Sequence, residues 1–323
     1  MPHAIRIHQT GGPDVLKWEE VEVGDPDPGQ VRLRQEAAGL NFIDTYHRTG
    51  LYPQPLPFTP GVEGAGIVEA VGPGVADVGV GDRVAYAGPV GAYAEERLID
   101  ADRVVKLPDA ISSEQAGAMM LQGMTAQMLL RSVHRVAAGE TILVHAAAGG
   151  VGLILCQWAK SLGATVIGTV GSDAKAALAR AHGCDHPIVY TRQDFVAEVE
   201  RMTAGAKLPV VYDGVGRDTF LKSLDCLAPR GLMVSYGNAS GPVEPISPLL
   251  LSQKGSLFLT RPTLYHYTAT RADLEEAASE LFAVIASGAV KVEVRQRFAL
   301  KDAAAAHRAL EARETSGSTV LTI

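Results

Sequence analysis

One segment, residues 141–152, constrains the fold more than any other part of the chain. It is an apolar run that ends in His-Ala-Ala-Ala-Gly-Gly-Val-Gly, and an apolar helix is expected from Gly152 to Leu162. Ala147, Gly149 and Gly152 take the three positions of the G-x-G-x-x-G pattern, with alanine at the first. Small residues there let backbone N–H groups approach a pyrophosphate at the helix N-terminus, and the third lets the helix pack closely. The segment predicts dinucleotide binding, with a purely structural tight turn as the alternative.

The chain before this turn and the chain after it predict different architectures. Short strand candidates separated by glycine and proline lie in the first part: Ala4–His8, Val15–Val23, Val31–Ala38, Gly66–Val71, Arg83–Ala87 and Tyr93–Ile99. From about Glu140, strands and helices alternate, which predicts a parallel, doubly wound sheet. A chain of 323 residues fits about two domains. We predict an α/β chain with a β-rich domain at 1–124 and 265–323 and a nucleotide-binding domain at 125–264.

The end of the second strand of the alternating part indicates which dinucleotide binds. An acid that holds the ribose of NAD is expected there, yet residues 168–171 are Gly-Thr-Val-Gly. Ser172 and Lys175 follow, and a lysine can pair with the 2′-phosphate of NADPH. Asp173 either caps the next helix or opposes that phosphate, and Lys175 also fits a solvated helix start. We predict NADPH rather than NADH.

Charge and cysteine content narrow the classes of partner and compartment. Lys plus Arg number 29 against 36 for Asp plus Glu, a net charge of −7, which disfavours a broad nucleic-acid surface. The cysteines, Cys156, Cys184 and Cys226, are odd in number and without C-x-x-C spacing, and the N-terminus has no apolar leader. The longest apolar stretch, 142–159, is interrupted by polar residues and glycine. We predict a cytoplasmic protein with no nucleic-acid or membrane partner.

Several segments together resemble one family over essentially the whole chain. They are Asn41-Phe-Ile-Asp44 with Tyr46, residues 60–66 (Pro-Gly-Val-Glu-Gly-Ala-Gly), 79–84 (Gly-Val-Gly-Asp-Arg-Val), 145–152 and 212–216 (Tyr-Asp-Gly-Val-Gly). The chain resembles the zinc-free NADPH:quinone oxidoreductases, the zeta-crystallin-like branch of the medium-chain dehydrogenase/reductase superfamily, and late segments such as 253–256 and 260–262 resemble the bacterial type. The resemblance implies a GroES-like catalytic domain plus a Rossmann domain, a homodimer, and a substrate cleft between the domains.

The resemblance also implies roles for individual residues. Asn41, Tyr46 and Tyr52 would form the catalytic pocket for the nicotinamide and the quinone. The implied cofactor contacts are Thr125, Gly149, Gly150 and Val151 at the ribose and phosphates; Ser172, Lys175 and Tyr190 at the 2′-phosphate; Tyr236, Gly237 and Asn238 at the nicotinamide end; and Arg261 and Arg313 from the C-terminal side. Tyr46 and Tyr52 also fit half-buried packing positions, and Tyr190 also fits a strand end. Asn41 also fits a turn or cap, and Arg313 a solvated helix position.

Zinc alcohol dehydrogenases belong to the same superfamily, so a metal has to be considered. Their catalytic zinc needs an early cysteine and a Gly-His-Glu run, and here those places resemble Asn41 and Val62 within Gly-Val-Glu. Asparagine and valine are not useful zinc ligands, and residues 85–120 lack the cysteines of a structural zinc lobe. We predict no metal, with Glu63 structural. Without a Lewis acid, an alkoxide is hard to stabilise, whereas a quinone is already electrophilic.

The leading hypothesis is therefore NADPH-dependent quinone reduction, with Asn41 N–H and tyrosine O–H groups as donors and with solvent protonating the product. A second hypothesis is reduction of the carbon–carbon double bond of 2-alkenals or enones, which would use the same fold and cofactor. A third, of another class, is a non-catalytic NADPH-binding protein, either crystallin-like or RNA-binding. The net charge of −7 disfavours RNA.

Overall fold

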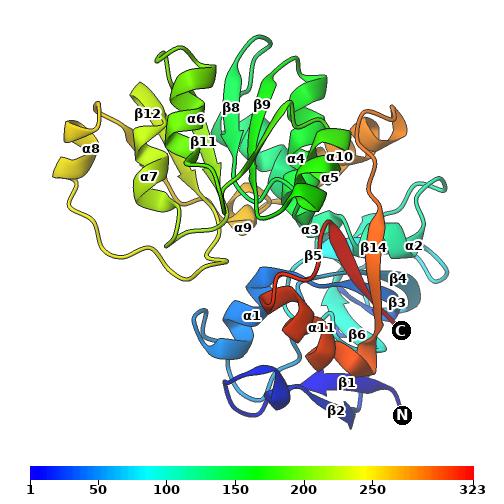
Figure 1. Cartoon of the computed structure of the whole chain (residues 1–323). Coiled ribbons are helices and arrows are strands. Elements are labelled where there is room, and N and C mark those ends of the chain that lie inside the picture. The colour runs from blue at the N-terminus through cyan, green and yellow to red at the C-terminus, as the bar shows by residue number, and fades with distance from the viewer. The chain divides into compact units, whose positions relative to one another are not determined.

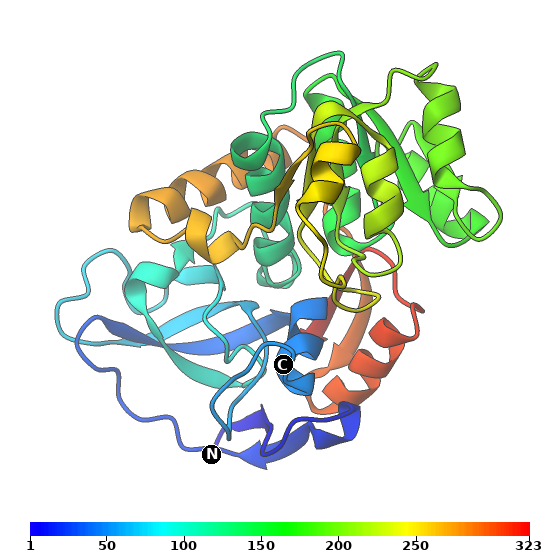
Figure 2. The ribbon, with the colours of Figure 1, turned by 90° about the vertical axis from the view of Figure 1, so that its left-hand side faces the viewer.

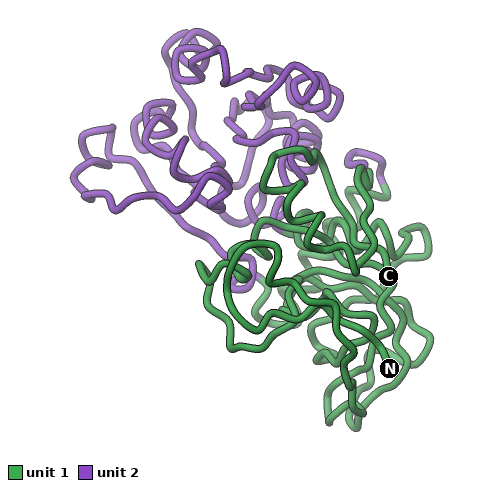
Figure 3. Tube along the Cα trace, turned by 60° about the horizontal axis from the view of Figure 1, so that its bottom comes forward, with its two compact units in different colours: residues 1–124, 268–286, 292–323 green, residues 125–267, 287–291 purple.

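The computed structural model describes residues 1–323, and within it the chain folds into two compact units. Unit 1 consists of Met1–Met124, Thr268–Ala286 and Val292–Ile323, and unit 2 consists of Thr125–Tyr267 and Ser287–Lys291 (Figure 3, green and purple). The short segment Ser287–Lys291 is tied to unit 2 through Gln157, whose amide bonds both backbone groups of Lys291.

Unit 2 contains a six-stranded sheet in which every strand pairs in parallel with its neighbours. Its strands are β8 (Thr141–Val144), β9 (Thr165–Val170), β10 (His186–Val189), β11 (Leu208–Asp213), β12 (Leu227–Ser235) and β13 (Phe258–Thr260). Their order in the sheet is β10-β9-β8-β11-β12-β13, so the direction of winding reverses between β8 and β11. The predicted doubly wound sheet is confirmed, and ligands of such sheets bind beyond the carboxyl ends of the strands at this reversal.

The helices of unit 2 connect these strands (Figure 1). They are α4 (Gly150–Ser161), α5 (Asp173–Ala181), α6 (Phe195–Met202), α7 (Phe220–Asp225), α8 (Leu249–Gln253) and α9 (Leu264–Tyr267). Helix α3 (Met120–Gln127) leads into the unit and continues as one π-helical turn, Met128–Val133. Helices α4 and α5 contact β8, β9 and β10, whereas α6 and α7 share an apolar core with Leu143, Ile167 and Val211 of the sheet. Burial of these faces anchors the loops beyond the strand ends.

Unit 1 is built around a seven-stranded sheet. Its strands are β3 (Gln30–Gly39), β4 (Glu63–Val71), β5 (Arg83–Ala87), β6 (Glu96–Asp100), β7 (Val105–Lys106), β14 (Val294–Ala299) and β15 (Ser318–Thr322), and a separate hairpin joins β1 (His3–Arg6) to β2 (Lys17–Glu20). The order is β14-β15-β3-β4-β5-β7, with β6 also paired to β3. Strand β15 thus completes a sheet whose first strand in the sequence is β3.

Four helices lie wholly within unit 1. They are α1 (Phe42–Thr49), α2 (Ser113–Gly117), α10 (Arg271–Ala286) and α11 (Ala303–Glu311), with short 3-10 turns at Pro13–Val15, Ala101–Arg103 and Leu300–Asp302. The turn at Pro13–Val15 shortens the strand that was expected from Val15 to Val23. Helices α1 and α11 are far apart in sequence but lie side by side (Figure 2). No helix is long and apolar enough to span a bilayer.

Candidate active site

Asn41 is the N-cap of α1, and its side chain is held by two other side chains. Its Nδ2 donates to Glu63 Oε1 at 2.6 Å, and its Oδ1 accepts from Gln122 Nε2 at 3.1 Å. Its backbone N–H donates to Asp44 Oδ2 at 2.8 Å, which closes the first turn of the helix. With 8% of its surface exposed, Asn41 is a buried amide of fixed orientation. Asn41 therefore has the cap position that the sequence offered as an alternative, and its side-chain amide also bonds Glu63 and Gln122.

Glu63 opens β4 and is fully buried. Its second oxygen, Oε2, accepts from the backbone N–H of Leu121 at 2.7 Å. Burial raises its pKa to about 8, while the hydrogen bonds from Asn41 and Leu121 act in the opposite direction. The carboxyl group occupies the space beside the α-carbon of Gly39: a Cβ there would lie 2.1 Å from Oε1. Glycine at position 39 is therefore a steric requirement of this carboxyl group.

Tyr46 lies on α1, and Tyr52 lies just after it. Their rings meet edge to face with centroids 5.3 Å apart, and the Tyr52 backbone N–H donates to the Tyr46 carbonyl at 3.1 Å. Tyr46 is buried and Tyr52 is partly exposed. The ring of Phe42 lies 6.5 Å from that of Tyr46, so both tyrosines belong to one aromatic cluster that begins one residue after Asn41. Asn41 thus precedes α1, Tyr46 lies on it and Tyr52 follows it, and the two tyrosines contact each other.

A buried polar network runs from α1 to α11. Asp44 Oδ2 accepts from the Tyr93 hydroxyl at 2.9 Å, and that hydroxyl lies 3.3 Å from His307 Nε2. His307 Nδ1 accepts from Arg48 at 2.9 Å, and Arg48 also pairs with both carboxylate oxygens of Glu311. Burial raises the pKa of Asp44 to about 7 and lowers that of His307 to about 3. Arg48, the one arginine on α1, is therefore bonded within the protein.

The glycine turn lies between β8 and α4, as predicted. Gly149 is the N-cap of the twelve-residue helix α4, so the first N–H groups of the helix have no acceptor within it. A Cβ on Gly152 would lie 2.3 Å from the Ala146 carbonyl oxygen, and Ala146 itself has a φ of 53°. Only glycine at 152 permits this close return of the helix onto the turn. The turn follows β8, one of the two strands at which the sheet reverses, and so lies where a pyrophosphate binds in such folds.

A second buried network, not anticipated from the sequence, lies beneath this turn. His145 Nδ1 is 2.8 Å from Thr169 Oγ1, and its Nε2 is 2.9 Å from Ser223 Oγ. Asp213, at the end of β11, accepts from Ser223 and, at 2.7 Å, from Thr219. Burial lowers the pKa of His145, while the nearby Asp213 acts in the opposite direction. Asp213 contacts Ser223 and not the imidazole of His145, so these three residues do not form a nucleophilic triad. Because His145 and Asp213 are fully buried, the network serves to join the strand ends.

The residues predicted for the adenosine end lie beyond β9 and β10. Ser172 caps α5, and its Oγ accepts from the Lys175 backbone N–H at 3.3 Å. The Tyr190 hydroxyl lies beside Gly171, where a Cβ would be 3.1 Å from it. Asp173, which the sequence left ambiguous, forms a bidentate ion pair with Arg192, and that pairing lowers the pKa of Asp173. Sequence reasoning missed Arg192, since nothing in the spacing links it to Asp173.

The residues predicted for the nicotinamide end lie beyond β11, β12 and β13. Gly237 packs on Gly214 so closely that a Cβ on Gly237 would lie 2.3 Å from the Gly214 carbonyl oxygen. Arg261, just past β13, donates to the Ser235 carbonyl at 2.8 Å, which places its guanidinium next to residues 236–238. These segments meet within unit 2. Thr125 lies on α3 at the start of that unit, and Arg313 lies in unit 1, in the exposed turn after α11.

The donor set does not fit a zinc ion. No group of three or more His, Cys, Asp or Glu side chains is arranged to hold a metal. At the two positions compared with zinc ligands, Val62 has no ligating atom in its side chain, and the Asn41 amide oxygen accepts a hydrogen bond from Gln122. The three cysteines are all buried thiols. A tetrahedral site would need nitrogen or sulfur ligands that this part of unit 1 does not have.

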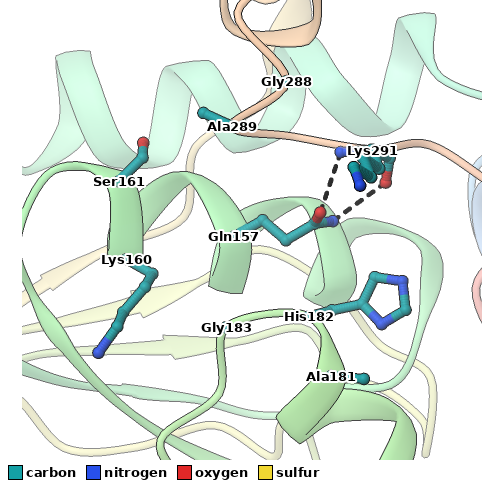
Figure 4. A pocket seen from close by; sticks show the side chains of 9 residues that line it. All are labelled: Gln157, Lys160, Ser161, Ala181, His182, Gly183, Gly288, Ala289 and Lys291. Carbon is teal, nitrogen blue, oxygen red and sulfur yellow. Dashed lines mark hydrogen bonds between the residues drawn. The ribbon is translucent and has the colours of Figure 1, made fainter.

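A separate hollow of about 340 Å³ lies on unit 2 (Figure 4). Its lining includes Gln157 and Lys160 of α4, and Lys291. Both polar atoms of the Gln157 side chain are bonded to the Lys291 backbone, and Lys160 pairs with Asp185 at 2.5 Å. The hollow lies toward the C-terminal end of α4, whereas ligands of doubly wound sheets bind at the helix N-termini. It is not the dinucleotide site.

Comparison with known protein families gives two matches along the chain. Residues 27–109 match the alcohol dehydrogenase GroES-like domain. Residues 150–283 match the family described as zinc-binding dehydrogenase. The first match lies in unit 1 and the second begins at the helix that follows the glycine turn. The predicted combination of a GroES-like domain with a Rossmann domain is confirmed.

Individual relatives are similar over their full length. The chain is 55% identical to a quinone oxidoreductase of Pseudomonas aeruginosa, over 99% of each chain. It is 49% identical to a 2-haloacrylate reductase of a Burkholderia species, again over 99% of each. The crystal structure of an Escherichia coli quinone oxidoreductase complexed with NADPH superposes with a TM-score of 0.98 at 50% identity, covering 99% of this chain and 100% of that one.

Proposed function

Because this chain belongs to the quinone oxidoreductase family of the medium-chain dehydrogenase/reductases, we propose that it is an enzyme that reduces quinones with NADPH. The observation that carries the proposal is the environment of Asn41. The position compared with a zinc ligand holds a buried amide whose Nδ2 donates to Glu63. An aromatic cluster that includes Tyr46 and Tyr52 begins at the next residue, Phe42. Hydrogen-bond donors beside flat aromatic rings suit a planar, electrophilic carbonyl compound.

NADPH is the cofactor of the proposal, and when bound it supplies the reducing electrons. The first turn of α4, with Gly149, Gly150 and Val151, would bind the phosphates through backbone N–H groups. Ser172, Lys175 and Tyr190 would bind the 2′-phosphate. Arg192 supports this choice, because its pairing neutralises the one carboxylate beside them.

The remaining contacts of the cofactor are proposals of the same kind. Tyr236, Gly237, Asn238 and Arg261 would lie at the nicotinamide end, supported by the bond that fixes Arg261 beside their loop. Thr125 and Arg313 would contact the cofactor from α3 and from the turn after α11.

Substrate binding and zinc independence follow from the donor groups of unit 1. Asn41, Tyr46 and Tyr52 would hold the quinone and donate to its oxygen as negative charge develops there. A quinone needs no Lewis acid, because the reduced ring is aromatic, and Asn41 and Val62 offer no zinc ligation. Water would supply the protons, since Asp44 and Glu63 are buried and already bonded to protein groups.

The edge of the sheet in unit 2 supports a homodimer. Strand β13 has a neighbour on one side only, and its Phe258 is 61% exposed. Leu259, next to it, and Leu249 on α8 are also exposed. An uncovered apolar edge strand is a surface for pairing with a second copy of the chain. We place the enzyme in the cytoplasm, because all its cysteines are free thiols.

Reduction of an activated carbon–carbon double bond is the second candidate, favoured by the 49% identity to a 2-haloacrylate reductase. A haloacrylate is an anion at neutral pH and needs a cationic partner. On α1, Arg48 is buried and bonded to Glu311 and His307, so it does not serve that purpose. The neutral groups near Asn41 favour a neutral substrate.

The deciding experiment measures NADPH oxidation by the metal-free protein with 1,4-benzoquinone, a larger ortho-quinone, a 2-alkenal and 2-chloroacrylate, each repeated with NADH. We expect turnover with the quinones and a preference for NADPH. Turnover with the alkenal or the chloroacrylate alone would assign the chain to double-bond reduction. Binding of NADPH without turnover of any substrate would contradict both enzymatic assignments.

A further inference from the structure

Four buried side chains of unit 1 form a continuous hydrogen-bonded chain that ends at the Glu63 carboxyl group. Ser318 Oγ donates to Gln122 Oε1 at 2.8 Å, Gln122 Nε2 donates to Asn41 Oδ1 at 3.1 Å, and Asn41 Nδ2 donates to Glu63 Oε1 at 2.6 Å. They come from four separate elements: β15, α3, the start of α1 and β4. Each of the four is less than a tenth exposed.

The chemistry of the carboxyl group sets the direction of this chain. Both Glu63 oxygens accept N–H bonds, one from Asn41 and one from the Leu121 backbone. A glutamine at this position would have to turn its own NH₂ toward one of those two donors. A carboxyl group can accept a hydrogen bond at each oxygen. Because both oxygens of Glu63 do so, Asn41 has to present Nδ2 to Glu63 and Oδ1 to Gln122.

In this fixed orientation, one of the two N–H groups of the Asn41 side-chain amide is not bonded to Glu63. The Nδ2 atom carries two hydrogens, and Glu63 accepts only one of them. Asn41 remains slightly exposed, at 8%, although Glu63 is fully buried. No member of this hydrogen-bonded series accepts the second hydrogen of Nδ2, and Asn41 is the most exposed of the four residues.

We propose that Glu63 and Gln122 are positioning residues that hold the Asn41 amide so that its second N–H donates to the carbonyl oxygen of the quinone. The inference rests on the proposed function, because it requires Asn41 to contact the substrate. Ser318 supports Gln122 in the same role. Gly39 is part of the arrangement, since any side chain there would displace the Glu63 carboxyl group.

The test begins with Glu63→Gln. The NH₂ of the new side chain would oppose Asn41 Nδ2, so the amide of Asn41 would turn over and present oxygen to the substrate. We expect kcat with 1,4-benzoquinone to fall about tenfold or more, as for loss of one positioned donor, with NADPH affinity unchanged. Glu69→Gln is the matched control, because Glu69 lies on the same strand in a half-exposed ion pair with Arg34.

The double variant Asn41→Asp with Glu63→Gln separates positioning from mere stability. The new amide at position 63 would donate to one oxygen of the new carboxylate at position 41, and Gln122 Nε2 would donate to the other. The series of hydrogen bonds is thereby restored, but the donor between positions 41 and 63 is now the side chain at position 63. We expect the melting temperature to recover toward that of the original protein while kcat stays low, because aspartate has no N–H in its side chain. Recovery of kcat together with the melting temperature would overturn the proposal.

Gln122→Leu provides a second route should Glu63→Gln fold poorly. It frees the Asn41 oxygen from its partner, and we expect kcat to fall with NADPH affinity unchanged. Turnover equal to that of Glu69→Gln in the folded variants would refute the positioning role while leaving the proposed function intact. Absence of quinone turnover in the unmodified protein would refute the proposed function itself.

Discussion

Asp173 and Arg192 form a bidentate ion pair across the ends of α5 and β10, with Arg192 Nη1 2.7 Å from Asp173 Oδ2. The pair resolves an ambiguity in the sequence, where an acid stands between two residues proposed to bind the 2′-phosphate of NADPH. The positive charge of Arg192 offsets the negative charge of Asp173, so Asp173 does not make the surroundings of Ser172 and Lys175 negative. Cofactor preference is therefore expected to depend on Arg192 as well as on Lys175.

Lys175→Ala should raise the KM for NADPH about tenfold and leave that for NADH nearly unchanged, because only NADPH has the phosphate that the ammonium group would bind. Such a factor corresponds to a charge-assisted hydrogen bond of about 1.4 kcal/mol. Steady-state kinetics with both cofactors measure it. Lys160→Ala, which removes a lysine from the far end of α4, is the control, and an equal change for NADPH and NADH would remove Lys175 from the phosphate site.

Arg192→Ala should weaken NADPH binding about threefold to tenfold, because the Asp173 carboxylate would then repel the phosphate. The double variant with Asp173→Asn should restore most of the affinity. Equilibrium binding of NADPH and NADH at low ionic strength is the measurement. Lys222→Ala, which breaks the comparable exposed pair with Asp194, should have no effect on either cofactor. If Arg192→Ala binds NADPH as tightly as the unmodified protein, Arg192 does not offset the repulsion between Asp173 and the phosphate.

His307 should make the protein less stable as the pH falls below about 6.5. Burial lowers its folded-state pKa to about 3, so between these values the unfolded chain binds more protons than the folded one. The free energy of unfolding should decline by up to about 1.4 kcal/mol per pH unit from this residue. His47, whose pKa burial lowers to about 4, acts in the same direction.

Urea unfolding between pH 5 and 8 measures this dependence. His307→Gln should lower stability at pH 8, because the bonds to Arg48 and Tyr93 are weakened, and should flatten the slope below pH 6.5. His8→Gln, at an exposed position, is the control. A slope identical to that of the unmodified protein would contradict the linkage.

Phe258→Glu should convert a dimer into a monomer, since it places a charge on the exposed edge strand β13. Light scattering coupled to size-exclusion chromatography measures the mass in solution. Leu221→Glu is the matched control, because Leu221 is similarly exposed but lies on α7, away from the edge. A dimer that persists in Phe258→Glu would require a different interface.

The sequence predicted the doubly wound sheet because strands and helices alternate there and because the glycine turn has a defined geometry. Helix α1 was not anticipated, although Asn41 and Asp44 have the spacing of a capping box, which was the available signal. The strand candidate at Val15–Val23 was too long, because Pro13 begins a 3-10 turn that overlaps its first residue.

Contacts between distant residues could not be predicted. Glu63 was expected to be merely structural, and its bond to Asn41 spans 22 residues in sequence. Arg192 meets Asp173, and His145 meets Ser223, only because the sheet brings separate strand ends together. No periodicity records such pairings, since they depend on the order of strands in space.

The pairing of β15 with β3 has a consequence for synthesis. Strand β15 lies inside its sheet, between β14 and β3. A ribosome delivers β3 early and β15 near the end, so the sheet of unit 1 cannot close until residues 318–322 have emerged. Unit 2 draws nearly all its residues from one continuous stretch, 125–267, and needs no such wait. The nucleotide-binding half should therefore fold first, and the sheet of unit 1 should be completed only after residues 318–322 have emerged.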